Sequence, residues 1–235
     1  MFNRKKRKKE KISSHKGIGL GPNLSFAAAE AYKLLRANVL FSLPDKKECK
    51  VIGITSSLPS EGKSTTAVNL AYMLAETEHK VLLLDGDMRM PSIAHKLGIN
   101  QTPGLSNVLA EQDIIAQILQ RSDLSNKLYV IAAGDIPPNP TELMGTAYMK
   151  KLISDLSHNF DFIVLDLPPV GEVADALIVS KYVDGMIVTV RQDYCTHRAL
   201  QKTIRQLEFA EIKILGFAVT RANTRKSKYY SYDRQ

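Results

Sequence analysis

Residues 51–65 read VIGITSSLPSEGKST and combine three local patterns. The first five, Val51–Thr55, are mostly β-branched, which predicts a buried strand. A loop of small and polar residues follows and ends in Gly-Lys-Ser at 62–64, where a helical pattern begins. A buried strand, a loop of this composition and a helix, in this order, are typical of a loop that binds phosphate groups.

Apolar runs alternate with helical patterns through the rest of the chain. Further strands are expected at 80–85, 128–132, 160–166, 185–190 and 214–219, and helices at 27–43, 64–76 and 199–209. Near-continuous Val, Ile and Leu predict parallel strands that are buried on both faces. The expected fold class is α/β: a doubly wound, mostly parallel sheet with helices on both faces, of the P-loop NTPase type. Ligands of such sheets bind beyond the carboxyl ends of the strands.

The loop carries the groups that a bound nucleotide needs. Its backbone N–H groups would surround phosphate oxygens, while Lys63 would reach the outer phosphates and the Ser64 hydroxyl would bind Mg²⁺. Ser57 stands where the GxxxxGK[ST] pattern has its first glycine. A helix N-cap after an ordinary strand is the simpler alternative, and the complete GKST sequence argues against it. The residues expected to bind the nucleotide are Ser57, Pro59, Ser60, Glu61, Gly62, Lys63, Ser64 and Thr65.

Two other expected strands end in acidic residues. Asp85 and Asp87 follow one apolar run, with Arg89 behind them, and Asp166 follows another. Buried carboxylates are costly unless a cation compensates them. Mg²⁺ shared with Ser64 and phosphate oxygens would do so, although either acidic motif alone could equally be a turn or a helix cap.

The net charge of +8 is concentrated in residues 1–11, which carry seven basic side chains against Glu10 alone. Subtracting that segment leaves the remaining chain at about +2. Such a run should be disordered. It could be a solvated tail without a role, a contact for anionic membranes or a patch for nucleic acid. We do not expect nucleic acid as a partner, because the rest of the chain shows no stripe of base-stacking aromatic residues.

Neither a membrane span nor a signal peptide is expected. No apolar stretch approaches the ~20 residues that cross a bilayer, and the basic start is followed by polar residues. A cytoplasmic chain, recruited to the inner face of the membrane by a partner, is therefore predicted. Cys49 and Cys195 should be reduced thiols, and Cys195 with His197 is expected to be a structural pair, not a metal site.

The three strand-end motifs together resemble those of the bacterial tyrosine kinases, a family of P-loop enzymes unrelated to eukaryotic kinases. Residues 56–65 look like the family's Walker A loop, with its leading serines. Residues 85–89, DGDMR, match its Walker A′ motif, and 162–169 match its Walker B motif. The segment 134–143, GDIPPNPTEL, is also similar to a family segment, without a role that follows from its residues. The resemblance runs from about Glu30 to the end of the sequence.

The resemblance implies a reaction between ATP and a protein tyrosine, with Mg²⁺ as the metal. Lys63 would stabilise charge on the transferred phosphoryl group, and Asp85 would orient or deprotonate the tyrosine hydroxyl. The residues expected to be catalytic are Lys63, Asp85, Asp87 and Arg89, and those expected to hold Mg²⁺, directly or through water, are Ser64, Asp87 and Asp166.

An acceptor for such a reaction is present in the sequence itself. Tyr229, Tyr230 and Tyr232 lie in the last seven residues, among polar and basic neighbours. By composition alone this cluster could simply dock on the domain. Beside the kinase-like motifs it resembles the family's tyrosine cluster, which implies autophosphorylation of these three residues. The cluster is shorter than many in the family and lacks their interspersed glycines.

The predicted first helix is similar to the family's ExxRxxR helix, which contributes to a ring of subunits. Glu30, Lys33 and Arg36 occupy its three positions, and Lys33 stands where an arginine is usual. Lysine keeps the charge and loses bidentate pairing. A routine pair of surface residues on one helix is the plainer interpretation of Glu30 and Lys33. If the ring forms, the tyrosine segment of one subunit would enter the site of its neighbour.

Partners and pathway also follow from the resemblance. In the Gram-positive branch of the family the catalytic domain is a separate chain, activated by a transmembrane partner of the polysaccharide co-polymerase type. The implied process is control of capsular or exopolysaccharide synthesis and export, with further protein tyrosines as substrates. The expected organisation is a basic tail and linker at 1–22, a kinase domain at 23–222 and a flexible tyrosine segment at 223–235.

Two other functions share these motifs in part. A switch ATPase of the chromosome-partition or septum-positioning type has the same fold, but carries a lysine where this chain has Leu58. A nucleotide-dependent scaffold without catalysis would use the basic tail and the tyrosine segment to bind partners. Mutation of Asp85 separates them, because a scaffold should keep its partners while a kinase should lose phosphotyrosine.

Overall fold

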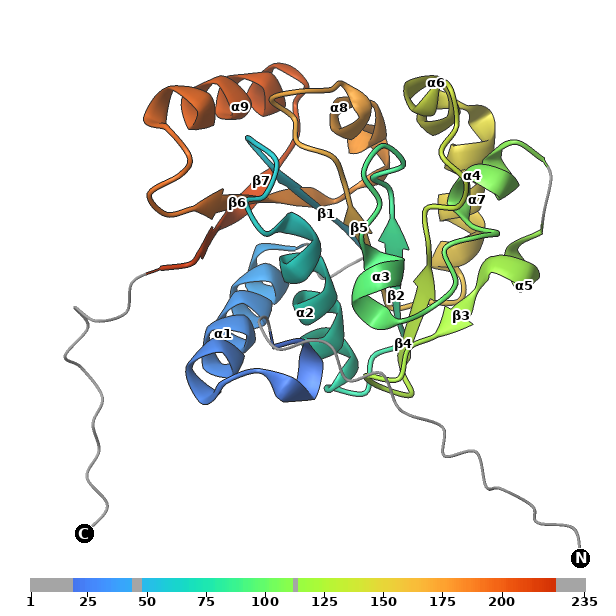
Figure 1. The fold of residues 1–235 in the computed structure, drawn as a ribbon, viewed down its shortest axis with the longest axis horizontal. Coiled ribbons are helices and arrows are strands. Elements are labelled where there is room, and N and C mark those ends of the chain that lie inside the picture. Colours follow the sequence, from blue (N-terminus) through green and yellow to red (C-terminus); the bar gives the residue numbers. More distant parts are fainter. Residues whose placement is uncertain (1–18, 44–47, 112–113, 223–235) are drawn as a thin grey trace, which may run out of the picture.

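A computed structural model of the chain describes residues 19–43, 48–111 and 114–222. The strands are β1 (Lys50–Ser56), β2 (Val81–Asp85), β3 (Gln120–Arg121), β4 (Leu128–Ile131), β5 (Phe162–Asp166), β6 (Gly185–Arg191) and β7 (Ile214–Thr220). They form one sheet in the order β3-β4-β2-β5-β1-β6-β7 (Figure 1). Every neighbouring pair is parallel except β3 and β4, so the predicted mostly parallel sheet is confirmed.

Helices cover both faces of this sheet, as expected for a doubly wound fold. They are α1 (Phe26–Ser42), α2 (Lys63–Ala75), α3 (Ile93–Leu97), α4 (Leu105–Leu109), α5 (Ile115–Ile118), α6 (Pro140–Gly145), α7 (Ala147–Ser157), α8 (Asp175–Val179) and α9 (His197–Phe209), with 3₁₀ turns η1 (Gly21–Asn23) and η2 (Ser180–Tyr182). One face packs against α1 and α2, and the other against α4, α7, α8 and α9 (Figure 1). No helix of the described residues is long and apolar enough to cross a membrane.

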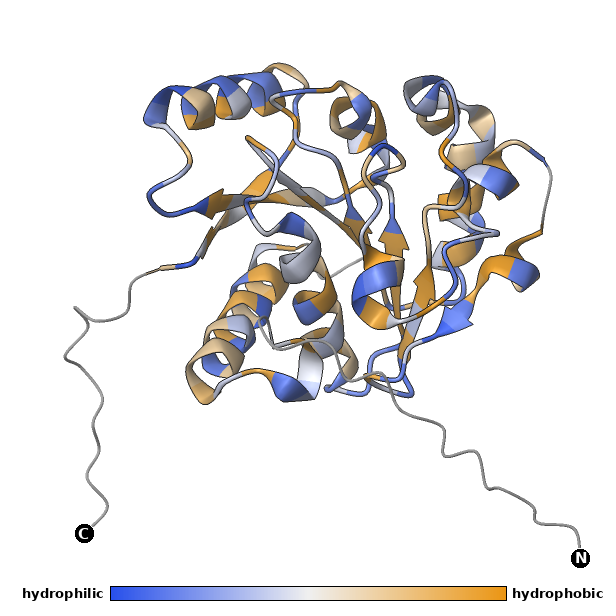
Figure 2. Ribbon diagram, in the orientation of Figure 1, coloured by the Kyte–Doolittle hydropathy of each residue, from blue (hydrophilic) through white to orange (hydrophobic). Residues whose placement is uncertain are grey.

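The core consists of two layers, because alternate residues of a strand point to opposite faces. On β5, Val164 packs toward α2, while Ile163 and Leu165 pack toward the α7 side. Both faces of the central strands are apolar in consequence, and Figure 2 shows these strands as the most hydrophobic part of the fold. The near-continuous apolar runs in the sequence have this physical origin.

The expected strands and helices all form, with ends that differ by at most two residues. The edge strand β3, the helices α3 to α8 and both 3₁₀ turns were not predicted. The edge strand β3 has only two residues, both polar, and its antiparallel pairing with β4 has no local sequence pattern. Helix α7 does have such a pattern, since its buried residues Met149, Leu152, Ile153 and Leu156 recur at helical spacing.

The strand order brings three loops to one place. Strand β5 lies between β1 and β2, and Asp166 at its end is directly opposite Asp85 at the end of β2. Because the three strands are parallel, the loops that follow them leave the sheet at the same edge. The phosphate-loop sequence and both acidic motifs therefore converge.

Candidate active site

The loop between β1 and α2 ends in a left-handed residue. Gly62 has φ +90°, which favours glycine, and a Cβ there would lie 3.1 Å from Thr220 Cγ2. Helix α2 begins at Lys63 without a side-chain cap at Gly62. The first N–H groups of α2 therefore receive no side-chain cap from Gly62, and the positive end of the helix dipole faces the loop. This is the geometry that binds phosphate.

Glu61 holds the loop from inside. Its side chain is fully buried, and its Oε2 accepts hydrogen bonds from the backbone N–H groups of Ser57 (2.7 Å) and Leu58 (2.8 Å). Its Oε1 accepts a longer bond from the Arg191 N–H, at 3.4 Å. The Glu61 carboxylate therefore fixes the first half of the loop, and the Ser57 N–H is already bonded to it. Sequence reasoning placed Glu61 in the nucleotide site and did not foresee this inward turn.

Thr220, at the end of β7, supports the loop from the other side. Its hydroxyl donates to the carbonyl oxygen of Glu61 at 2.8 Å. Thr220 was not among the expected site residues, because no local pattern links it to a loop 159 residues earlier. Gly171, in the loop after β5, also presses on this segment: a Cβ there would lie 2.2 Å from the Ser57 carbonyl oxygen.

Lys63 contacts the carboxylates of two different strand ends. Its Nζ lies 2.7 Å from Asp87 Oδ2 and 3.5 Å from Asp166 Oδ1, and all three side chains are largely buried. Burial alone would lower the pKa of Lys63, but the carboxylates of Asp166 and Asp87 outweigh it, so the pKa is raised above its ordinary value. The Lys63 ammonium therefore offsets the negative charge of these two acids.

Asp85 is fully buried at the end of β2. Its Oδ2 accepts from the backbone N–H groups of Ser92 (3.3 Å) and Ile93 (3.1 Å), and its Oδ1 accepts from the Asp87 N–H at 3.2 Å. Burial, reinforced by the neighbouring Asp166 carboxylate, raises the pKa of Asp85 to about 7. Asp85 therefore both shapes the loop after β2 and has a carboxyl group that titrates near neutral pH.

Asp166 has the features expected of a magnesium ligand. Both of its carboxylate oxygens are buried, and neither has a hydrogen-bond partner among the described residues. Burial raises its pKa, and attraction to the Lys63 ammonium opposes the rise. Among the described residues, no group of three or more His, Cys, Asp or Glu side chains is placed to hold a metal ion by itself. Mg²⁺ fits this arrangement, since it usually takes one or two carboxylates and completes its octahedron with phosphate oxygens and water.

Arg89 does not point at Lys63 but is bound to a second buried acid. It donates to Asp175 Oδ2 through Nε (2.9 Å) and to Asp175 Oδ1 through Nη2 (3.2 Å). Its Nη2 also donates to the Thr141 hydroxyl at 2.8 Å, and that hydroxyl donates to Asp175 Oδ1 at 2.6 Å. Thr141 belongs to the 134–143 segment, which now has a structural role: it packs beside the loop after β2.

The expected oligomer residues lie together on α1. Lys33 and Glu30 form an exposed ion pair at 2.7 Å within the helix. Arg36 turns toward α2, where its Nη1 donates to the Met73 carbonyl oxygen at 2.7 Å. Neither cysteine of the described residues forms a disulfide; Cys49 is buried and Cys195 is partly exposed. Tyr229, Tyr230, Tyr232 and the basic segment 1–11 lie outside the described residues.

Comparisons with known proteins identify the family of this chain. Residues 49–214 match the AAA domain family. Tyrosine-protein kinase YwqD of Bacillus subtilis is 34% identical over 204 residues, 87% of this chain and 85% of that protein. Tyrosine-protein kinase CpsD of Streptococcus agalactiae is 33% identical over 86% of this chain and 87% of its own length.

A solved structure of a tyrosine kinase domain has the same fold. The kinase domain of the Escherichia coli tyrosine kinase ETK is 28% identical, with a TM-score of 0.78, over 88% of this chain and 80% of that one. The septum site-determining protein MinD of Pyrococcus horikoshii shares the fold at 24% identity, with a TM-score of 0.60 over 72% of this chain and 69% of that one. The chain belongs to the bacterial tyrosine-protein kinase family, as the resemblance of its motifs predicted.

Proposed function

We propose that this kinase uses ATP and Mg²⁺ to phosphorylate the tyrosines of its own segment 229–232, with the segment of one subunit entering the site of another. The observation that carries the proposal is the convergence of Lys63, Asp87 and Asp166 beyond the carboxyl ends of three adjacent strands. Phosphoryl transfer asks a protein mainly for positioning and charge neutralisation. Those are the two properties of this cluster.

The loop and Lys63 hold the triphosphate in this proposal. The N–H groups at the start of α2 bind phosphate oxygens, and Glu61 and Thr220 keep the loop in shape for them. The Lys63 ammonium leaves Asp87 for the transferred phosphoryl group, where it neutralises charge. Asp87 and Asp166, with the Ser64 hydroxyl, are the residues that would hold the metal. Mg²⁺ held there would supply positive charge that offsets the negative charge of the phosphates.

In this proposal Asp85 orients or deprotonates the tyrosine hydroxyl. A base works best when its pKa lies near the working pH, and the pKa of Asp85 is raised to about 7. Its oxygens already accept three backbone N–H bonds, so the acceptor hydroxyl has to share the carboxylate with the loop. Arg89 acts from a distance in this scheme, by holding the loop that carries Asp85 and Asp87.

Self-association is supported by the surface of α1. Phe26, Leu34 and Phe41 of this helix are 83%, 64% and 89% exposed, which is unusual for large apolar side chains. Burial of these residues against a neighbour would place Glu30, Lys33 and Arg36 in a subunit interface. Arg36 would have to release the Met73 carbonyl to pair across that interface. Phosphates on clustered tyrosines would then add repulsion and weaken the ring.

The biological setting is proposed from the family resemblance. The kinase would act in capsular or exopolysaccharide synthesis and export, activated at the inner face of the membrane by a transmembrane protein of the polysaccharide co-polymerase type. Its basic segment 1–11 would contact anionic lipid. Other protein tyrosines would be further substrates.

Mass spectrometry tests the proposal. The purified chain is incubated with ATP and Mg²⁺, with and without the activator's cytoplasmic peptide, beside Lys63→Met and Asp85→Asn controls. Phosphate on Tyr229, Tyr230 or Tyr232 of the wild type, absent from both variants, is the expected result. ATP hydrolysis with unmodified tyrosines, even with the activator present, would refute it and favour a switch ATPase. Size measurements before and after phosphorylation test the ring, because the assembly in solution should be smaller after phosphorylation.

A further inference from the structure

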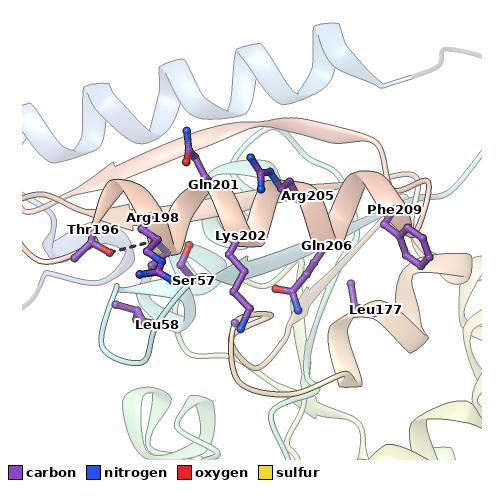
Figure 3. A pocket seen from close by; sticks show the side chains of 12 residues that line it. Ser57, Leu58, Leu177, Thr196, Arg198, Gln201, Lys202, Arg205, Gln206 and Phe209 are labelled. Carbon is purple, nitrogen blue, oxygen red and sulfur yellow. Dashed lines mark hydrogen bonds between the residues drawn. The ribbon is translucent and has the colours of Figure 1, made fainter.

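A groove of about 820 Å³ opens beside the phosphate-binding loop (Figure 3). One wall is helix α9, and the other is formed by Ser57 and Leu58 of the loop together with Gly171 and Leu177. The wall opposite α9 therefore belongs to the segment that Glu61 holds in place. The proposed mechanism makes no use of this groove.

The α9 wall is strongly basic. Arg198, Lys202 and Arg205 all line the groove, at the i, i+4 and i+7 spacing that places residues on one side of a helix. Within the part of the chain that the structure describes, no acidic residue lines it. All three cations are exposed, and within the described residues none of them takes part in an ion pair or a hydrogen bond. In Figure 3 the side chain of Arg198 is drawn close to Ser57, and that of Lys202 extends away from α9 along the same groove.

An anionic segment would complement this wall, and the chain can produce one. Residues 223–235, NTRKSKYYSYDRQ, carry four basic side chains and Asp233, a net charge of +3. In that form the segment is repelled by the groove. Each phosphotyrosine adds roughly −1.5 to −2, so phosphorylation of Tyr229, Tyr230 and Tyr232 would bring the net charge to roughly −1.5 to −3. Phosphorylation thus reverses the sign of the interaction.

The segment is also attached close to the groove. It follows Ala222, two residues after Thr220, whose hydroxyl is bonded to Glu61. The Glu61 carboxylate in turn binds the backbone of Ser57 and Leu58, which form the groove wall. Tyr229 lies nine positions after Thr220, enough for an extended reach of about 30 Å. The segment can therefore fold back into the groove of its own subunit.

We propose that the α9 groove binds the chain's own 223–235 segment after its tyrosines are phosphorylated. This inference rests on the proposed function, which supplies the phosphate. Arg198 and Lys202 pair with phosphotyrosine oxygens through charge-assisted hydrogen bonds. The product so held lies along the loop that binds ATP, where it restricts the approach of a further acceptor segment. Newly made phosphotyrosine is thereby retained by the subunit that carries it.

Fluorescence anisotropy with synthetic peptides provides the test. The peptide is 223–235 with phosphate on all three tyrosines, or on none, added to the full-length chain with Tyr229→Phe, Tyr230→Phe and Tyr232→Phe so that its own segment cannot compete. Only the phosphorylated peptide should bind, and rising salt should weaken it. The double variant Arg198→Gln, Lys202→Gln should weaken binding at least tenfold.

Two matched variants locate the binding. Lys151→Gln removes a cation from an exposed position of α7, far from the groove in the fold, and should leave binding unchanged. Lys63→Met tests the phosphate loop and should also leave it unchanged. Binding that is lost in Lys63→Met but kept in the Arg198, Lys202 double variant would overturn the inference, as would equal binding of both peptides or binding of neither.

The peptide experiment is independent of catalysis. If mass spectrometry finds phosphate on the wild-type tyrosines and the groove variants do not affect peptide binding, the inference fails and the proposed function stands. If the groove binds the phosphopeptide and the wild type never phosphorylates these tyrosines, the proposed function fails, and the groove's affinity for phosphotyrosine stands.

Discussion

The guanidinium of Arg89 donates two hydrogen bonds to the buried carboxylate of Asp175, a residue 86 positions later in the chain. Thr141 bonds to both partners. Three segments meet in this contact: the loop after β2 that carries Asp87, the start of α6 and the start of α8. The loop that presents the acids of the site is therefore fixed by residues outside that site.

Asp175→Ala should destabilise the protein by about 2 kcal/mol. Removing one partner of a buried ion pair costs several kcal/mol, and the cost is smaller here because the Arg89 side chain is 38% exposed. Urea unfolding measures the change. The exposed pair Glu30–Lys33 is the control, and Lys33→Ala should cost less than about 1 kcal/mol. Equal losses of unfolding free energy in the two variants would show that Asp175 stabilises the fold no more than an exposed ion pair does.

Glu61→Ala should weaken both the fold and the binding of nucleotide. It leaves the N–H groups of Ser57 and Leu58 without their acceptor, at about 1–3 kcal/mol for a buried group. Urea unfolding and titration with an ATP analogue measure the two effects. Glu61→Gln should lose much less in both, because its amide oxygen can still accept these bonds. A Gln variant as weak as the Ala variant would mean that the negative charge matters more than the bonds.

Gly171→Ala should displace the phosphate-binding loop. The added methyl group would lie 2.2 Å from the Ser57 carbonyl oxygen, a distance that forces one backbone to move. We expect a loss of about 1–3 kcal/mol in unfolding free energy, as for other overpacked sites, together with weaker binding of an ATP analogue. Gly145→Ala is the control, since its methyl group would make an ordinary 3.5 Å contact with Ile178. Unchanged nucleotide affinity in Gly171→Ala would contradict the close packing of these loops.

The unfolding free energy of the metal-free protein should fall as the pH rises from 5 to 8. The folded pKa of Asp85 is raised from 3.8 to about 7, so the folded chain holds this proton more tightly than the unfolded chain. The associated stability is complete below about pH 4 and is lost as the pH passes through 7, at most about 4 kcal/mol.

Denaturation in the presence of a chelator, at several pH values, measures this effect. Asp85→Asn cannot titrate, so its curve should be flatter than that of the wild type over the same range. Parallel curves for the two proteins would show that Asp85 titrates far from neutrality. The contribution of Asp166, whose pKa is raised in the same direction, remains in both proteins.

The fold could be predicted from the sequence because parallel strands are buried on both faces and leave long apolar runs, as in β1 and β5. Lys63, Asp85, Asp87 and Asp166 could be placed together for a related reason, since each lies at the end of a strand or its following loop. The inward turn of Glu61 could not be predicted, because it depends on the three-dimensional path of its own loop.

The partners of Arg89 were out of reach for a different reason. Asp175 and Thr141 lie in segments that meet the loop after β2 only when the sheet is assembled, and side chains so far apart in sequence leave no local pattern. Arg89 was expected to contact the reacting groups and instead bonds to these two residues in the protein without ligands. The pair could not be predicted because Arg89 and Asp175 are far apart in the sequence, whatever their residue types.

The bond between the Thr220 hydroxyl and the Glu61 carbonyl has a practical consequence. Movement of the nucleotide loop must be transmitted to the end of β7, two residues before Ala222. A small environment-sensitive dye at Ala222 would therefore report nucleotide occupancy optically, without labelling the loop itself. For the same reason, an affinity tag joined directly after β7 would load the loop mechanically.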